Sequence, residues 1–321
     1  MKYTGKVTVV GAGFMGAVIA TLYARYGYDV ALHDTSSEAL ASFRSRAEPI
    51  AASLVTAGES PGAILDRVTP NADLADAVRG AFLVQETVQE DLAVKQDLFR
   101  RLDDLCRPEV YLATNTSSLM LSAICAGMKH PERALGIHFV TPAHIIRVVE
   151  LIHAKFTSPE TLAWGRAFVE TIDHVGVACA ERPGHLLIRI HFAILAEVFR
   201  IVADGTSTPE EIDAVFRLSL GPRYALWGPF LTDDLVVNKK TCLSIWQYLS
   251  EKTGETRFAD ESLLAGKVAR GEVGAIAGKG WYEFGQDYAT IVRTRDAQLK
   301  EIFDWLRERE AWQAYGARPV V

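Results

Sequence analysis

The stretch that decides the fold is VTVVGAGFMG, residues 7–16 of a 321-residue chain. It is a short apolar run that leads directly into the pattern G-x-G-x-x-G. In this pattern Gly11 allows a tight turn, Gly13 lets the backbone approach a pyrophosphate, and Gly16 lets the following helix lie close to the strand. The stretch therefore predicts a strand, a glycine turn and a helix that bind a dinucleotide.

The next apolar run supports the same interpretation. Residues 30–33 form this run, and it ends on Asp34, eighteen residues after Gly16. The pyrophosphate is expected at the N-terminus of the helix that opens with Phe14 and Met15. Asp34 is expected to accept hydrogen bonds from the ribose hydroxyls and to repel a 2′-phosphate, which favours NAD over NADP. Glycines also collect in structural turns, so the glycine pattern alone is weak evidence. The dinucleotide site is predicted from the strand, the glycines, the helix, the second strand and Asp34 in the expected order and spacing.

Composition and charge exclude several classes of protein. Hydrophobic residues make up 49% of the chain and charged residues 23%, which is ordinary for a globular protein. The net charge of −6 argues against binding to nucleic acid or to a membrane surface. No apolar run approaches the roughly 20 residues that span a bilayer. The length suffices for two domains, each with its own core.

The N-terminus and the cysteines predict a cytoplasmic protein. The first strand begins near Lys6, which leaves no room for a signal peptide. The four cysteines include no C-x-x-C pair, so we expect buried thiols in a reducing compartment and no metal site. They are Cys106, Cys125, Cys179 and Cys242.

Strands and helices alternate as far as about residue 180. Strands are expected at 82–84, 111–113, 134–138, 148–152 and 175–178, and helices at 37–56, 92–105 and 159–172. This alternation predicts an α/β fold, with an N-terminal Rossmann-type domain built on a doubly wound, mostly parallel sheet. Ligands of such sheets bind beyond the carboxyl ends of the strands.

The pattern changes at Arg182-Pro183-Gly184, after which helical periodicity prevails, as at 186–202 and 208–218. We therefore expect an NAD-binding domain at 1–182 and an all-helical substrate and dimerisation domain at 183–321. The first of these helices has more apolar residues than one helical face needs, which favours a homodimer over a helix buried within its own domain. They are Ile188, Ile190, Phe192, Leu195, Val198 and Phe199.

His138 is the histidine best placed for chemistry. It ends an expected strand, and Glu150 lies twelve residues later in the next apolar run. On adjacent strands the carboxylate could orient one imidazole nitrogen and leave the other free as a base. The alternative is a structural histidine satisfied by a nearby carboxylate.

The chain resembles the 3-hydroxyacyl-CoA dehydrogenase family across both domains, and within it the branch that acts on L-gulonate and L-carnitine. The spacing of Ser117 and His138 also matches the family. The motifs that carry the resemblance are Gly11–Gly16, Asn115–Leu119, His138–Pro142, Val149-Glu150, Pro183-Gly184, Gly228–Phe230 and Gly278–Tyr282.

This resemblance implies roles for single residues. His138 would take the proton of the substrate hydroxyl while a hydride passes to the nicotinamide, Glu150 would orient His138, and Ser117 would bond the reacting oxygen. It also implies cofactor contacts from Ser117, Thr141, Glu90 and Lys95, in addition to the glycine turn.

Two departures from the family concern the substrate side. Thr141 and Ile188 stand where the family commonly has asparagine, so two carboxamides are missing. Arg223 could pair with a substrate carboxylate or lie in a dimer contact.

An acyl-CoA enzyme would also need cations for the CoA phosphates. No lysine lies between Lys6 and Lys95, and only arginines remain for this task. The candidates are Arg44, Arg46, Arg67 and Arg79.

Three functions remain open at this point. The first is an NAD-dependent oxidoreductase that converts a small gulonate- or carnitine-like 3-hydroxy acid to its 3-keto product by hydride transfer. The second is a 3-hydroxyacyl-CoA dehydrogenase. The third is a dinucleotide-binding structural or sensing protein with weakened catalysis.

Overall fold

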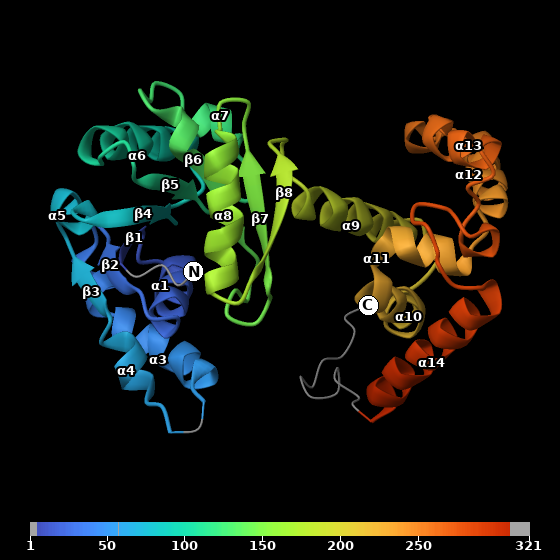
Figure 1. Ribbon diagram of the computed structural model, residues 1–321, viewed down its shortest axis with the longest axis horizontal. Coiled ribbons are helices and arrows are strands. Elements are labelled where there is room, and N and C mark those ends of the chain that lie inside the picture. Colours follow the sequence, from blue (N-terminus) through green and yellow to red (C-terminus); the bar gives the residue numbers. More distant parts are fainter. Residues whose placement is uncertain (1–4, 57, 309–321) are drawn as a thin grey trace. The chain divides into compact units, whose positions relative to one another are not determined.

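The computed structural model describes residues 5–56 and 58–308, in two compact units, 1–195 and 196–321 (Figure 1). Residues 309–321 of the expected second domain lie outside the described residues. The two units are described separately below.

The first unit contains an eight-stranded sheet with the strand order β3-β2-β1-β4-β5-β6-β7-β8. Neighbouring strands are parallel except β6 and β7, which run antiparallel, and β8 then pairs parallel with β7. The predicted doubly wound, mostly parallel sheet is thus confirmed. The strands are β1 (Lys6–Val10), β2 (Asp29–His33), β3 (Val68–Asn71), β4 (Ala81–Glu86), β5 (Tyr111–Thr114), β6 (Ala134–Phe139), β7 (Val148–His153) and β8 (Val175–Ala180).

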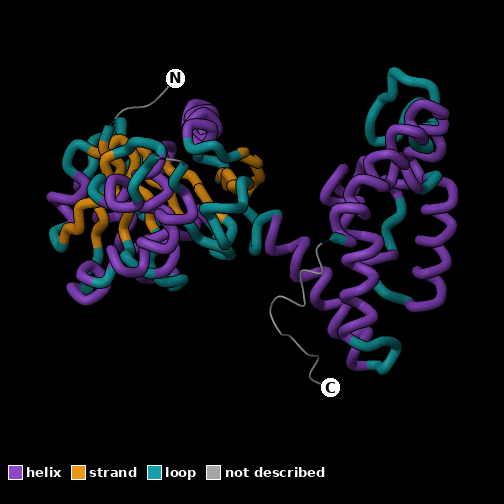
Figure 2. The backbone as a smooth tube through the Cα atoms, turned by 90° about the horizontal axis from the view of Figure 1, so that it is seen from below, coloured by secondary structure: helices purple, strands orange, loops and turns teal. Residues whose placement is uncertain are grey.

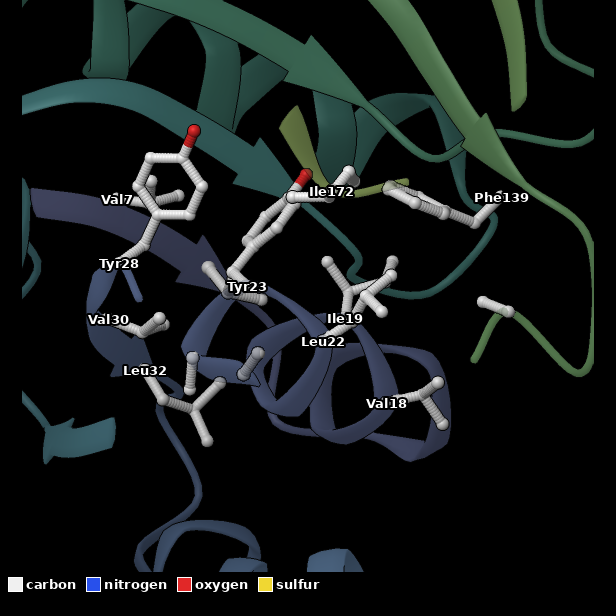
Figure 3. Packing of buried hydrophobic residues seen from close by; sticks show 14 of the residues in the cluster. Val7, Val18, Ile19, Leu22, Tyr23, Tyr28, Val30, Leu32, Phe139 and Ile172 are labelled. Atoms are coloured by element: carbon white, nitrogen blue, oxygen red, sulfur yellow. The ribbon is translucent and has the colours of Figure 1, made fainter. Parts of the chain in front are cut away.

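Two hydrophobic clusters attach the helices to this sheet. One joins α1, α3 and α8 to the strands, and the other joins α5, α6 and α7 to them. Figure 3 shows Ile19 and Tyr23 of α1 packed among buried side chains that include Val30 and Phe139. The helices are α1 (Phe14–Arg25), α2 (Ser37–Ala41), α3 (Phe43–Leu54), α4 (Pro61–Leu65), α5 (Leu74–Val78), α6 (Leu92–Leu105), α7 (Leu121–Ile124) and α8 (Pro159–Thr171), with a 3₁₀ turn at Pro131–Arg133.

The helix expected at 37–56 is in fact two helices, α2 and α3, separated at Ser42. The Ser36 side chain caps α2 by accepting from the N–H of Ala39. The Ser42 hydroxyl donates to the Ala39 carbonyl at 3.3 Å, a local bond that competes with the helical ladder. Strand β3 was not expected either, because it is short, largely exposed and contains Pro70, as only an edge strand tolerates.

The second unit is helical. Residues 196–308 contain helices and loops, whereas the strands of the described chain belong to the first unit (Figure 2). Its helices are α9 (Leu187–Ala203), which begins in the first unit, α10 (Pro209–Val215), a π-helical segment (Phe216–Leu220), α11 (Gly221–Val236), α12 (Lys239–Thr253), α13 (Ser262–Ala269) and α14 (Tyr288–Arg307), with 3₁₀ turns at Thr256–Phe258 and Ala275–Ala277.

Candidate active site

The glycine turn has a geometry that only glycine permits at two positions. Gly11 has φ +107°, and a Cβ there would lie 2.7 Å from the backbone of Thr87. A Cβ on Gly16 would lie 1.7 Å from the carbonyl oxygen of Gly11. The turn and the close seating of α1 on β1 therefore require these glycines.

Gly13 instead faces open space. A Cβ at this position would meet nothing within 4 Å. Gly11 and Gly13 line a cleft of about 710 Å³, together with Asp34 and Thr87. This volume is within the range of cofactor sites. The cleft thus offers a dinucleotide both space and the N-terminal amides of α1.

Asp34 lies in the same cleft, directly after β2. Its Oδ2 accepts a hydrogen bond from the N–H of Ala12 at 2.7 Å, and its Oδ1 accepts one from Ser36 at 2.8 Å. A carboxylate offers about four lone-pair sites, so each oxygen can still accept from a ribose hydroxyl. The residues of this cleft therefore fit a nicotinamide dinucleotide with an unmodified ribose.

The loop after β6 meets the start of α1. The Thr141 hydroxyl donates to Met15 Sδ at 3.3 Å, and Phe14, the first residue of α1, is 65% exposed. This contact joins the β6 end of the sheet to the glycine turn, so Thr141 lies beside the cofactor cleft.

His138 and Glu150 are direct neighbours on the antiparallel strands β6 and β7. His138 Nδ1 lies 2.7 Å from Glu150 Oε2, and both side chains are buried. The other carboxylate oxygen, Oε1, accepts from the N–H groups of Leu186 at 2.9 Å and Leu187 at 2.7 Å. Burial by itself would raise the pKa of Glu150, but these bonds and the His138 imidazole together hold it below its usual value. Glu150 is therefore a carboxylate held in place at Nδ1 of the imidazole.

Ser117 completes a chain of three side chains. Its Oγ lies 3.1 Å from His138 Nε2, the nitrogen that Glu150 leaves free. The loop that carries Ser117 is held by Glu90 Oε1, which accepts from the N–H groups of Ser117 and Ser118, each at 3.0 Å, and from Thr116 Oγ1 at 2.6 Å. The structure thus brings Ser117, His138 and Glu150 together.

Glu90 is held in turn by Lys95. Lys95 Nζ lies 3.4 Å from Glu90 Oε2 and 2.6 Å from Oε1 of Glu86. Burial raises the pKa of Glu86, although the Lys95 charge acts against it. Burial would also raise the pKa of Glu90, but the Thr116 bond and the Lys95 charge keep it below its usual value. In this structure Glu90 and Lys95 therefore position the Ser117 loop, while the Glu90 side chain stays 39% exposed.

The two substrate candidates lie in different units. Ile188 is the second residue of α9, is half-buried, and adds no polar atom to the site. Arg223 belongs to α11 of the second unit, where its Nε donates to the Ser219 carbonyl at 3.1 Å and its Nη2 to the Ser219 hydroxyl. Both of these hydrogen bonds of Arg223 lie within the second unit.

The sequence analysis did not assign a role to two side chains that bear on the site. Asn115 Oδ1 accepts from the N–H of Phe139 at 2.9 Å and so fixes the end of β6 beside His138; its position directly after a strand was the available signal. His185 is 2% exposed, and within the described chain neither ring nitrogen has a hydrogen-bond partner. Burial holds the pKa of His185 below its usual value, although the Glu150 charge acts against this. The only signal for His185 was its place directly after Pro183-Gly184.

Residues 5–56 and 58–308 contain neither a metal site nor a membrane-spanning helix. No group of three or more His, Cys, Asp or Glu side chains there is arranged to hold a metal ion. Within this described part of the chain, every helix is too short or too polar to cross a membrane.

Comparison with known proteins agrees with this geometry. Residues 6–182 match the family model "3-hydroxyacyl-CoA dehydrogenase, NAD binding domain", and residues 184–284 match "3-hydroxyacyl-CoA dehydrogenase, C-terminal domain". A probable 3-hydroxybutyryl-CoA dehydrogenase of Deinococcus radiodurans is 32% identical over 87% of this chain and 100% of its own length. An L-carnitine dehydrogenase of Bacillus cereus is 37% identical over 71% of this chain and 70% of its own.

The solved structures give the same result. The crystal structure of a 3-hydroxyacyl-CoA dehydrogenase from Archaeoglobus fulgidus has a TM-score of 0.81 at 30% identity and covers 94% of this chain and 99% of its own. The cleft at the glycine turn, the Ser117–His138–Glu150 chain and these similarities agree with one another: the chain belongs to the 3-hydroxyacyl-CoA dehydrogenase family and is an NAD-dependent oxidoreductase of that class.

Proposed function

We propose that His138 is the general base that removes the hydroxyl proton of a 3-hydroxy substrate. The observation that carries this proposal is the hydrogen-bonded chain in which Ser117 Oγ lies 3.1 Å from His138 Nε2 and Glu150 Oε2 lies 2.7 Å from Nδ1. A neutral imidazole that donates from Nδ1 to Glu150 has a free lone pair on Nε2, on the side of Ser117.

Ser117, His138 and Glu150 each have a distinct task in this proposal. The substrate hydroxyl donates to Nε2 and accepts from the Ser117 hydroxyl, and its proton then moves to Nε2. Glu150, held by the amides of Leu186 and Leu187, stabilises the positive charge that forms on the imidazole. Bound NAD supplies the acceptor for the hydride that leaves the same carbon. The protein thus contributes position and proton transfer.

We propose a small free 3-hydroxy acid, gulonate- or carnitine-like, as the substrate. The support is the lack of free cations in the segment before Lys95, where a CoA thioester would need to bind its phosphates. Residues 7–94 have no lysine, and their five arginines already have partners within the chain. The pairs are Arg25 with Glu59 at 3.1 Å, Arg44 with Asp66 at 2.9 Å, Arg67 with Asp29 at 3.1 Å, Arg79 with Asp76 at 2.8 Å, and Arg46 with three carbonyl oxygens.

A 3-hydroxyacyl-CoA thioester is the second candidate. It is favoured by the similarity to the 3-hydroxybutyryl-CoA dehydrogenase of D. radiodurans, which extends over more of this chain than the similarity to the L-carnitine dehydrogenase. A structural or sensing role has no comparable support, because the Ser117–His138–Glu150 chain is intact.

The test is NADH formation by the purified protein with L-gulonate, L-carnitine, 3-hydroxybutyrate and 3-hydroxybutyryl-CoA, each with NAD and with NADP. Turnover of a free acid with NAD is the expected result. Turnover of the thioester alone would support the second candidate and overturn the first. No turnover of any member, with NAD still bound in a calorimetric titration, would contradict both candidates.

We further propose a division of labour between residues 1–182, for the cofactor and the proton, and residues 183–321, for the substrate and for a homodimer. The two family matches meet near this boundary. We also propose a cytoplasmic location, which the four free cysteines support. The dimer is supported by α9, where Ile190, Phe192 and Phe199 are 53–66% exposed. Phe199→Glu should convert the dimer to a monomer in sedimentation equilibrium, and a wild-type monomer would contradict the dimer itself.

A further inference from the structure

Arg46, on α3, makes a set of hydrogen bonds that its place in the sequence did not suggest. Its Nη2 donates to the carbonyl oxygens of Ala12 at 2.7 Å and Ala39 at 2.8 Å, and its Nη1 donates to that of Gly13 at 3.3 Å. Its Nε also donates to Ser42 Oγ at 3.2 Å. One guanidinium thus joins the glycine turn to the break between α2 and α3.

The planarity of the peptide bond gives these contacts a consequence for the cofactor. The carbonyl of Ala12 and the N–H of Gly13 belong to one trans peptide group, so they point in opposite directions. The same holds for the carbonyl of Gly13 and the N–H of Phe14. Because Arg46 binds both carbonyls, both N–H groups are turned away from it. Within the described chain neither N–H has an acceptor, as is usual at the start of a helix.

The break between α2 and α3 makes this arrangement possible. α2 ends at Ala41, and the Ala39 carbonyl near its end accepts from Arg46. Ser42, at the break, supplies the fourth acceptor. A continuous helix over 37–56 would have used the Ala39 carbonyl in its own ladder.

We propose that Arg46 is a positioning residue for NAD: through the Ala12 carbonyl it orients the amide of Gly13 toward the pyrophosphate. The amide of Phe14 is held mainly by α1, because the Gly13 carbonyl also accepts from the N–H of Ala17 at 3.0 Å. Arg46 is therefore not available to bind a phosphate of the substrate, and its role is the same for a free acid and for a thioester. Its five fixed donors suit this task, because a lysine ammonium is a compact point charge that cannot present the same planar fork.

The test is direct titration of the variants with NAD by isothermal calorimetry. Arg46→Gln should weaken NAD binding by about tenfold, which corresponds to about 1.4 kcal/mol, because amides that are no longer preorganised must be ordered when NAD binds. Arg46→Lys keeps the charge but loses the fork, so its dissociation constant should lie between those of Arg46→Gln and the wild type. The matched control is Arg44→Gln, on the same helix, whose side chain is 59% exposed and paired with Asp66.

A second readout separates positioning from a general loss of structure. The amide resonance of Gly13 in a ¹⁵N–¹H spectrum should shift in Arg46→Gln and stay in place in Arg44→Gln, while the calorimetric stoichiometry stays at one NAD per chain. If Arg46→Gln does not fold, Arg46→Lys carries the test. Two results would overturn the assignment. One is that Arg46→Lys binds NAD as tightly as the wild type does, and the other is that Arg46→Gln binds NAD as tightly as Arg44→Gln does.

Discussion

The cofactor end of the first unit and its reaction end are built from different kinds of atoms. The cofactor end (Gly11–Gly16, Asp34 and Arg46) presents backbone amides and the space left by absent side chains. The reaction end (Ser117, His138 and Glu150) consists of side-chain atoms from three separate segments, joined in one hydrogen-bonded chain.

This difference predicts different responses to mutation. At the cofactor end we propose that several amides share the binding of one pyrophosphate, so the loss of one side chain is expected to change affinity or selectivity moderately. At the reaction end each group has a single task, so the loss of one imidazole or carboxylate is expected to reduce turnover strongly. Variants at both ends test this difference.

The largest effect is expected for His138→Ala. Its kcat should fall by at least about 10²-fold, the usual contribution of a general base, because within the described residues His138 is the one imidazole hydrogen-bonded to Ser117. NAD affinity, measured by calorimetry, should not change. His130→Ala, at an exposed position, is the matched control. Near-normal turnover of His138→Ala would remove His138 from the mechanism.

Glu150→Gln should have the next largest effect. The one amide oxygen can accept from His138 Nδ1 or from the N–H groups of Leu186 and Leu187, but not from both sides, and it does not stabilise the imidazolium. We expect kcat to fall by about 10- to 100-fold, since a hydrogen bond to a charged group contributes about 1.5–3 kcal/mol. Single-turnover kinetics with saturating NAD would measure this. A change in the KM for substrate with kcat intact would mean that Glu150 acts in binding instead.

Asp34→Ala tests the cofactor end and should leave kcat with NAD nearly unchanged. The preference for NAD over NADP should fall by about tenfold, because two unit charges about 4 Å apart repel by about 1 kcal/mol or more at a solvated site. The ratio of kcat/KM for the two cofactors measures the effect. If this ratio equals that of the wild type, Asp34 does not read the ribose.

The smallest effect concerns His185 beside the reaction end, whose buried ring nitrogens have no hydrogen-bond partner within the described chain. His185 has φ +48°, which disfavours phenylalanine equally at every pH, so His185→Phe is predicted only to change how the free energy of unfolding depends on pH. Since burial lowers the pKa of His185 in the folded state, the unfolded chain binds more protons below about pH 6.5. The wild type therefore loses stability as the pH falls through this range.

His185→Phe lacks this titrating imidazole. Its free energy of unfolding, measured in urea titrations, should therefore rise relative to that of the wild type between pH 8 and pH 5. The other titrating groups are the same in both proteins, so their contributions cancel when the two free energies of unfolding are subtracted. A gap that stays constant with pH would show that His185 has a partner in solution or is already charged.

Most elements of the first unit could be predicted from the sequence. The expected helix at 92–105 has the same bounds as α6, because Asp91 caps it and its apolar residues follow one face. The break at Ser42 and the edge strand β3 were missed. The break accompanies hydrogen bonds from the Ser42 and Arg46 side chains to the Ala39 carbonyl, which helical periodicity does not predict, and β3 depends on its pairing with β2.

The sequence by itself determined the cofactor end. Strand, glycine turn, helix and Asp34 follow one another within about thirty residues, and each restricts the backbone locally, so their spacing carries the information. The family resemblance likewise rests on short motifs that are readable one at a time.

The contacts within the reaction end depend on the tertiary structure, and sequence spacing alone did not decide them. The contact between His138 and Glu150 depends on the antiparallel register of β6 and β7, and a shift by one residue would turn one of them to the opposite face of the sheet. Ser117 reaches His138 because Glu90, twenty-seven residues earlier, holds its loop. The roles of Arg46 and His185 also depend on atoms distant in the chain, and sequence spacing does not encode such contacts.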